Sequence, residues 1–153
     1  MMDRIREFYH LADTYCRYVS SGEMTYTDIP VLIELLMKLY LSAVSLPEAE
    51  PETLDAAVSE KIQVRFDRRI PVFYWEVFDP FIQDEAVCED LTDALSDIAA
   101  ELKNGMTEFE AGRTGNAVHE WKFGLNHHWG SHAVSALRAL HTLRIRRNDT
   151  CEG

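Results

Sequence analysis

The stretch from 28 to 45, DIPVLIELLMKLYLSAVS, is the most hydrophobic segment of the chain. Between Pro30 and the closing serine, its only strongly polar residues recur every fourth position, at Glu34, Lys38 and Ser42. On a helix this spacing leaves one narrow polar stripe, and a helix that is apolar around most of its circumference belongs in the middle of a bundle. We therefore predict a central helix over 28–45. With two charges in about fourteen residues, it is too short to cross a bilayer.

Helical spacing continues on both sides of this segment. Residues 3–20 repeat apolar side chains at steps of three and four and end at Ser-Ser-Gly. Residues 90–104 carry a leucine-rich stripe with an acidic stripe on the far side, which is typical of a solvated helix face, and we expect Gly105 to end this helix. Beyond Ala111-Gly112 two more helices are predicted, with a turn between them at Gly130-Ser131.

Residues 54–70 fit two kinds of secondary structure. Their apolar side chains keep helical spacing, although Ile62, Val64 and Phe66 also alternate as they would in a strand. We favour a helix, because no second strand-like run with turn chemistry is present to pair with this one.

The stretch IPVFYWEVFDPF at 70–81 is rich in aromatic residues and interrupted by prolines. It is too aromatic for an exposed loop and too interrupted for a long helix. We interpret it as an irregular connection near 70–82 that Phe73, Trp75 and Phe78 anchor in the core. The alternative is an aromatic-lined cleft.

The composition is that of a globular protein, with 46% apolar and 10% aromatic residues. A chain of 153 residues can bury most of its unfolded surface as one domain without metals or disulfides. We therefore predict a single all-α domain over 1–153, a helical bundle of about six helices with the irregular aromatic connection near 70–82.

The charge of the chain excludes some partners. The net charge of −11 argues against nucleic acid, which needs a basic surface, and against anionic membranes. Residues 76–110 carry eleven acidic residues and one lysine, whereas residues 111–153 carry six Lys and Arg against three acids. These opposite signs indicate either two elements that face each other or one acidic outer surface.

Three cysteines, Cys16, Cys88 and Cys151, are scattered without a CxxC motif or metal-type spacing. Such a set suits a reducing cytoplasm, where a free cysteine behaves as a small apolar residue. The N-terminus has no apolar region of an export signal, and no segment resembles a transmembrane span. We expect a cytoplasmic protein.

The stretch HEWKFGLNHHWGSH at 119–132 holds four of the six histidines and two of the three tryptophans. His128 and His132 are four residues apart and would share one face of an unbroken helix. Asp93 and Asp97, also four apart, could supply carboxylates from the acidic stripe. Zinc and iron sites need imidazole and carboxylate groups that converge from at least two elements. A metal cluster of these four residues is therefore one hypothesis.

Other features of the same segment count against a metal. Gly130 could break the helix between the two histidines, and neither HExxH nor ExxH is present. We favour a structural hydrogen bond between one of these histidines and Asp93 or Asp97. No G-x-S-x-G, GxxxxGK[ST] or GxGxxG motif occurs, so no residue is assigned a catalytic role and no organic cofactor is expected.

Three blocks of sequence carry a family resemblance: YWEVFDPF at 74–81, DLTDALSDIAAELKNG at 90–105 and AVHEWKFGLNHHWGSHAVSALRALH at 117–141. In order and spacing they resemble the DUF5063 domain family, a bacterial family of unknown function. The resemblance covers approximately 60–145, and residues 1–60 match only in helical character. It implies a small, soluble, all-helical bacterial protein and brings no activity, cofactor or partner. The blocks include Trp75, Asp93, Asp97, Glu120, Trp121, His128, Trp129 and His132.

Our leading hypothesis is a non-enzymatic cytoplasmic protein that binds another macromolecule, with a protein as the expected partner. It rests on the missing catalytic motifs, the acidic middle of the chain and the surplus of aromatic residues. One alternative is a metal-binding protein or metal-dependent enzyme built on the Asp/His cluster. Another is a small-molecule pocket lined by Phe73, Trp75, Trp121 and Trp129. The candidate interaction residues are Trp75, Glu120, Trp121 and Trp129.

Overall fold

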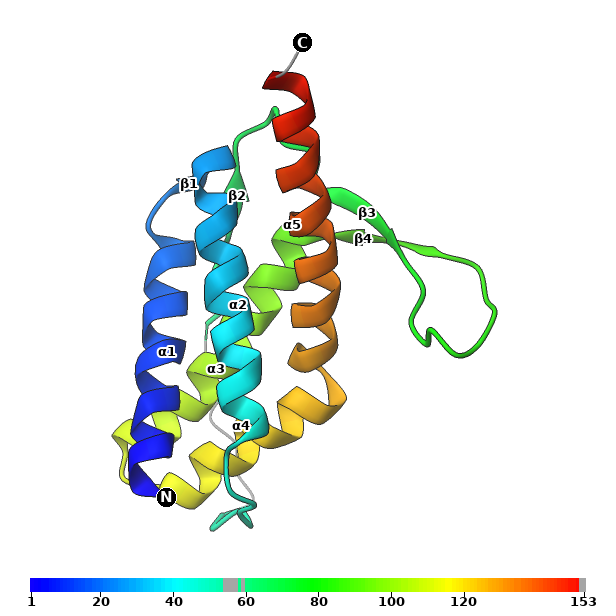
Figure 1. The fold of residues 1–153 in the computed structure, drawn as a ribbon. Helices are drawn as coiled ribbons and strands as arrows, with labels where there is room; N and C mark the ends of the chain where they lie inside the picture. The colour runs from blue at the N-terminus through cyan, green and yellow to red at the C-terminus, as the bar shows by residue number, and fades with distance from the viewer. Residues whose placement is uncertain (54–57, 59, 152–153) are drawn as a thin grey trace.

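The computed structural model describes residues 1–53, 58 and 60–151. These residues form a bundle of helices from which a hairpin projects (Figure 1). The helices are α1 (Met2–Ser20), α2 (Ile29–Val44), α3 (Leu91–Glu110), α4 (Thr114–His127) and α5 (Trp129–Cys151), with a short 3-10 helix, η1 (Tyr26–Asp28), before α2. The strands are β1 (Glu23–Met24), β2 (Arg65–Phe66), β3 (Phe73–Glu76) and β4 (Val87–Asp90).

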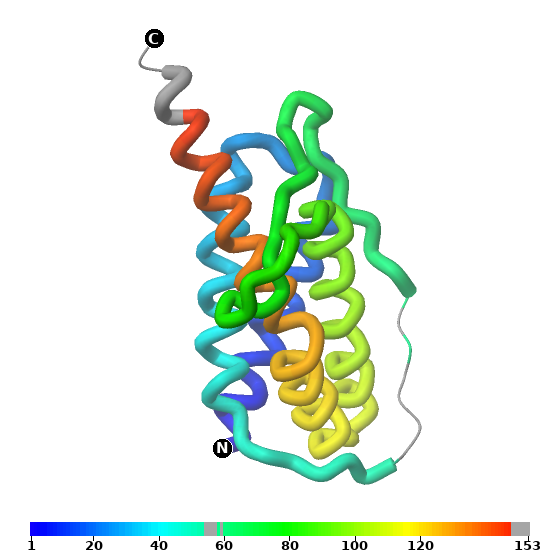
Figure 2. The backbone as a smooth tube through the Cα atoms, turned by 90° about the vertical axis from the view of Figure 1, so that its right-hand side faces the viewer, coloured from blue at the N-terminus to red at the C-terminus, as the bar shows by residue number. Residues whose placement is uncertain are grey.

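The architecture is mostly helical, as predicted, but it is not the pure all-α bundle of about six helices. The helix α3 is central, since it packs against α1, α4 and α5, whereas α2 packs mainly against α1 and α5. Two small sheets complete the fold: β1 pairs with β2 in parallel, and β3 pairs with β4 antiparallel. The hairpin β3–β4 lies against α5 and beside the start of α3 (Figure 2).

The helix predicted over 28–45 is present as α2, but its predicted central position is wrong. Its buried face consists of Ile29, Leu32, Leu35, Leu36, Leu39 and Ala43. Away from this face, five large apolar residues are exposed: Val31, Met37, Tyr40, Leu41 and Val44. The extra apolar residues of α2 therefore form surface instead of core. In the described part of the chain, every helix is too short or too polar to span a lipid bilayer.

The helix α3 begins where predicted but does not end at Gly105. The side chain of Asp90 caps it by accepting a hydrogen bond from the backbone N–H of Thr92 at 2.8 Å. The helix then runs past Gly105 and gives way at Gly112, whose positive φ of 81° favours glycine. Gly105 is required for packing, because a Cβ atom there would lie 2.1 Å from Nε1 of Trp121.

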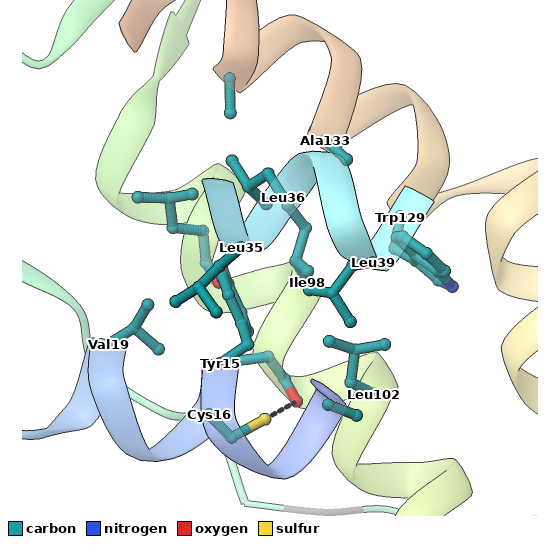
Figure 3. Close-up of a cluster of buried hydrophobic side chains, with 14 of the residues drawn as sticks. Tyr15, Cys16, Val19, Leu35, Leu36, Leu39, Ile98, Leu102, Trp129 and Ala133 are labelled. Carbon is teal, nitrogen blue, oxygen red and sulfur yellow. Dashed lines mark hydrogen bonds between the residues drawn. The ribbon is translucent and has the colours of Figure 1, made fainter. Parts of the chain in front are cut away.

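Two tryptophans fill the interior between the helices. Trp121 is fully buried, and its Nε1–H donates to the carbonyl of Leu102 at 3.0 Å. Trp129, also fully buried, donates to the carbonyl of Trp121 at 2.9 Å. Figure 3 shows Trp129 within a cluster of buried side chains from α1, α2, α3 and α5. The two tryptophans of segment 119–132 therefore face the interior of the bundle.

The break between α4 and α5 lies at His128, slightly before the turn predicted at Gly130-Ser131. His128 has a non-helical backbone, with φ −148° and ψ −80°. Gly130 lies in the first turn of α5, and a Cβ atom there would be 2.0 Å from the carbonyl oxygen of Leu125. The glycine therefore permits close packing of the two helices, and it does not separate them.

The helix predicted over 54–70 is wrong for the part that the structure describes. Residues 54–57 and 59 lie outside the described residues, and the chain that follows contains β2 instead of a helix. The backbone N–H of Val64 donates to the hydroxyl of Ser96 in α3 at 3.1 Å. The alternation of Ile62, Val64 and Phe66 was therefore a better indication of structure than their helical spacing. The partner strand was missed because β1 comes from a distant part of the chain.

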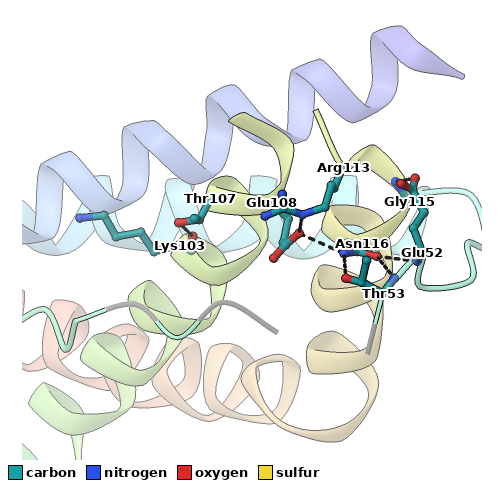
Figure 4. A network of polar contacts seen from close by, with 8 residues as sticks. All are labelled: Glu52, Thr53, Lys103, Thr107, Glu108, Arg113, Gly115 and Asn116. Atoms are coloured by element: carbon teal, nitrogen blue, oxygen red, sulfur yellow. Dashed lines mark hydrogen bonds and ion pairs between the residues drawn. The ribbon is translucent and has the colours of Figure 1, made fainter. Parts of the chain in front are cut away.

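A buried polar network ties the loop after α2 to the turn between α3 and α4 (Figure 4). The side-chain oxygen of Asn116 accepts hydrogen bonds from the backbone N–H groups of Glu52 at 2.5 Å and Thr53 at 3.2 Å. Its amide nitrogen donates to the hydroxyl of Thr53 at 2.8 Å and to the carboxylate of Glu108 at 3.0 Å. Arg113 binds the same Glu108 carboxylate. Glu108 and Asn116 are buried, so these bonds replace the water that both side chains have lost.

Candidate functional site

The acidic stripe of α3 faces the start of α5. Nδ1 of His128 lies 2.9 Å from Oε1 of Glu101, and Nε2 of His132 lies 4.0 Å from Oδ2 of Asp97. The two imidazole rings meet edge to face, with their centroids 5.0 Å apart. Asp93 takes part in neither pair. The second half of the stripe therefore links α3 to the α4–α5 junction, but the short contact joins His128 to Glu101, whereas His132 and Asp97 are too far apart for the predicted hydrogen bond.

The surroundings of the Glu101 carboxylate disfavour its charged form. Burial raises the pKa of its carboxyl above the ordinary value, and Asp97 and Glu120 raise it further, whereas His128 lowers it. Its Oε2 atom is buried without a hydrogen-bond partner. Among the described residues, no group of three or more His, Cys, Asp or Glu side chains is placed to hold a metal ion. The metal hypothesis gains no support from this geometry, and the pairs serve as links between helices.

The structure separates the four aromatic residues that were predicted to line one pocket. Trp121 and Trp129 lie in the core, whereas Phe73 and Trp75 are 70% and 73% exposed. Phe78, the third predicted core anchor of this connection, is 76% exposed. The aromatic connection is therefore not anchored in the core by these side chains. The physical reason for Phe73 and Trp75 is that they belong to strand β3, whose alternation places them on the opposite face from Tyr74.

The hairpin β3–β4 has one face toward the bundle and one toward solvent. Tyr74 is on the inner face, where its hydroxyl and that of Ser135 in α5 are hydrogen-bonded at 2.7 Å. Burial raises the pKa of the Tyr74 hydroxyl, whereas its hydrogen bond with Ser135 lowers it. Phe73 and Trp75 alternate with Tyr74 along β3, and their side chains are exposed. The base of the hairpin is thus fixed while its aromatic face remains open.

The loop that joins β3 to β4, residues 77–86, is called the arm here, and it projects away from the bundle (Figure 1). The carbonyl of Asp79 accepts from the backbone N–H of Ile82 at 3.1 Å, and its side chain accepts from that of Phe81 at 2.9 Å. An aspartate followed by a proline at the start of such a turn is a favoured β-turn sequence. The arm therefore displays Phe78, Phe81 and Ile82 to solvent from an ordered turn.

A groove of about 1130 Å³ lies between β3 and α5 and reaches α2. Residues 71–78 all line it, whereas β4 contributes none of the lining residues. Its main apolar lining residues are Tyr40, Val44, Phe73, Trp75, Phe78 and Val134. Small-molecule pockets are usually about 300–1,000 Å³ and enclose most of their ligand. The size of this groove and its many exposed side chains favour a longer occupant.

Two arginines give the groove a basic side. Arg138 and Arg146 of α5 line it and are exposed, and neither pairs with a carboxylate of the described chain. Glu76 is the acidic residue of the lining. No motif in the sequence marks these arginines. Their spacing with Thr142, four residues from each, was the available signal, since it places all three on one face of a helix.

Together these features define a small helical-bundle domain that has an apolar groove on its surface, beside a projecting arm. The chain belongs to the DUF5063 family, described as a domain of unknown function, whose model matches residues 1–146. The match includes the first 60 residues, for which the sequence blocks gave only helical character.

Among solved structures, the chain is similar to protein BF1032 from Bacteroides fragilis, a target of the Northeast Structural Genomics Consortium. The two chains are 18% identical, the likeness covers 92% of each, and the TM-score is 0.72. At this identity the likeness shows the fold alone. No curated protein matches the sequence.

Proposed function

We propose that this protein is a non-catalytic binding domain that takes up an apolar segment of another polypeptide in the groove between β3, α5 and α2. The observation that carries the proposal is the exposure of large aromatic side chains on β3 and the arm, beside this groove. Contiguous apolar surface of this kind usually marks an interaction site. Aromatic residues are also enriched at the centres of protein interfaces, where they contribute most of the binding energy.

The arginines of the groove further define the polypeptide segment that it binds. Arg138 and Arg146 are free to pair with carboxylates, and guanidinium groups suit such pairing because they bind both carboxylate oxygens at once. The segment that fits the groove therefore carries bulky apolar side chains together with acidic residues. Cys16 and Cys88 are free thiols, so we place this binding in a reducing cytoplasm.

The test is a selection of peptides from a random library displayed on phage, with the wild-type protein as bait, immobilised sparsely so that single chains are presented. Two variants of α5 provide the comparison. Val134→Glu puts a charge into the lining of the groove, whereas Ile145→Glu makes the same kind of change at an exposed position outside it. Both sites are exposed on one helix, so both variants should fold, which circular dichroism checks.

The expected result is a set of peptides that combine aromatic and acidic residues. They should bind the wild type and Ile145→Glu equally, and Val134→Glu about tenfold or more weakly, a loss of about 1.4 kcal/mol. Failure to enrich any peptide, or equal binding to Val134→Glu, would overturn the proposal.

A further inference from the structure

We infer that the occupant of the groove is the arm of a second copy of this chain, so that two copies exchange arms in a symmetric dimer. This inference rests on the proposed function, because it names the polypeptide that the groove binds. The arm carries exposed apolar side chains and acidic residues, and the groove has an apolar lining and two arginines.

The arm presents apolar side chains that its own chain leaves uncovered. Phe81, in the Asp79 turn, is 97% exposed, and Ile82 beside it is 59% exposed. Neither of them lines the groove of its own chain. Because the turn already fixes the backbone at Phe81, docking costs less backbone entropy than it would for an unordered loop. An exposed aromatic on a preformed turn is therefore well suited to act as an anchor.

Charge complementarity selects this occupant. Residues 76–90, the arm with its flanking strands, contain six acidic residues and no Lys or Arg. Residues 129–147 of α5 contain four arginines and no acidic residue. Within the described chain, Arg138, Arg144 and Arg146 of α5 form no ion pair with a carboxylate of 76–90. Contact between two copies would pair these opposite charges, which one chain leaves apart.

The geometry of the hairpin directs the arm outward. Its base is fixed to the bundle by the hydrogen bond between Tyr74 and Ser135 and by that from the backbone N–H of Leu91 to the carbonyl of Val72 at 2.8 Å. The arm then points away from the helices (Figure 1). In a two-fold dimer every contact occurs twice, so each arm fills the groove of the partner. A stable interface buries roughly 1,200–2,000 Å² in total, and each arm therefore needs to supply about half of that area.

Sedimentation equilibrium over a wide range of protein concentrations is the first test. The wild type should approach twice the 17.6 kDa mass of the chain. The arm variant Phe81→Ser/Ile82→Ser and the groove variant Arg138→Glu/Arg146→Glu should both stay monomeric, while Ile145→Glu should dimerise like the wild type. A monomeric wild type, or arm and groove variants that dimerise unchanged, would overturn the inference.

A peptide separates this inference from the proposed function. A fluorescent peptide of residues 76–90, with the change Cys88→Ser, is added to the monomeric arm variant, whose groove is intact. It should bind, and binding should weaken about tenfold or more when Val134→Glu is also present. If this peptide does not bind while library-selected peptides do, the inference fails and the proposed function stands. If neither kind of peptide binds, both fail.

Discussion

Replacing Gly105 by alanine tests whether the indole of Trp121 dictates a glycine in the middle of α3. The added Cβ would lie 2.1 Å from Nε1 and 2.5 Å from Cδ1 of the indole. Ordinary contact between such atoms begins at about 3.5 Å, so the ring must retreat by roughly 1.4 Å, the difference from 2.1 Å. Trp121 is fully buried and bonded to the carbonyl of Leu102, so the ring meets packed neighbours and this hydrogen bond breaks.

Three contributions set the magnitude of the effect. Forcing a methyl group into a packed core costs about 1–3 kcal/mol. Leaving the indole N–H buried without a partner costs about 1–3 kcal/mol more. The better helix propensity of alanine offsets about 1 kcal/mol. The free energy of unfolding should therefore fall by about 3 kcal/mol, which lowers the Tm of a chain of this size by roughly 6–12 °C.

Thermal and urea unfolding, followed by far-UV circular dichroism, measure this change. A double-mutant cycle with Trp121→Phe is the control, because the smaller ring leaves room for the methyl group and the alanine should then cost far less. The reasoning is refuted if Gly105→Ala is as stable as the wild type, or if the two substitutions are simply additive.

Three further substitutions test other parts of the structure. Burial raises the pKa of Glu101 in the folded state, so the fold holds this proton more tightly than the unfolded chain does. The free energy of unfolding of the wild type should therefore fall as the pH rises from the ordinary glutamate pKa through the raised pKa of Glu101. Urea melts of Glu101→Gln should show a smaller fall over the same pH range, and equal pH profiles for the two proteins would contradict the prediction. Asn116→Ala removes a hydrogen bond from buried Glu108 and should cost about 2–3 kcal/mol in the same melts, whereas a loss below about 0.5 kcal/mol would show that the network adds nothing. Tyr74→Phe deletes the hydroxyl that joins the hairpin to Ser135. The free energy of unfolding should fall by about 1 kcal/mol, and amide hydrogen exchange in β3 and β4 should become faster. Unchanged exchange would mean that other contacts hold the hairpin.

The helices could be predicted because their signals are local. Apolar spacing along 3–20 and 28–45 and the capping residue Asp90 each depend on neighbours within a few turns, and α1, α2 and the start of α3 follow them. The break near Ala111-Gly112 is likewise local, since a positive φ is costly for other residues.

The remaining features depend on partners far away in the sequence. Gly105 looks like a helix end until Trp121 is placed against it, and the outward apolar side of α2 looks like core until α3 takes the central position. Hydrophobicity alone assigns Phe73, Trp75 and Phe78 to the core, whereas all three are exposed. The exposure of Phe73 and Trp75 follows from the pairing of β3 with β4, which no local pattern predicts.

Every residue of the arm, from 77 to 86, is exposed, and the hairpin is fastened to the bundle only near its base. Substitutions in the arm should therefore leave folding almost untouched, while under the proposed dimer they abolish self-association. The arm would then be a part of this short chain that contributes to assembly and almost nothing to the stability of the bundle.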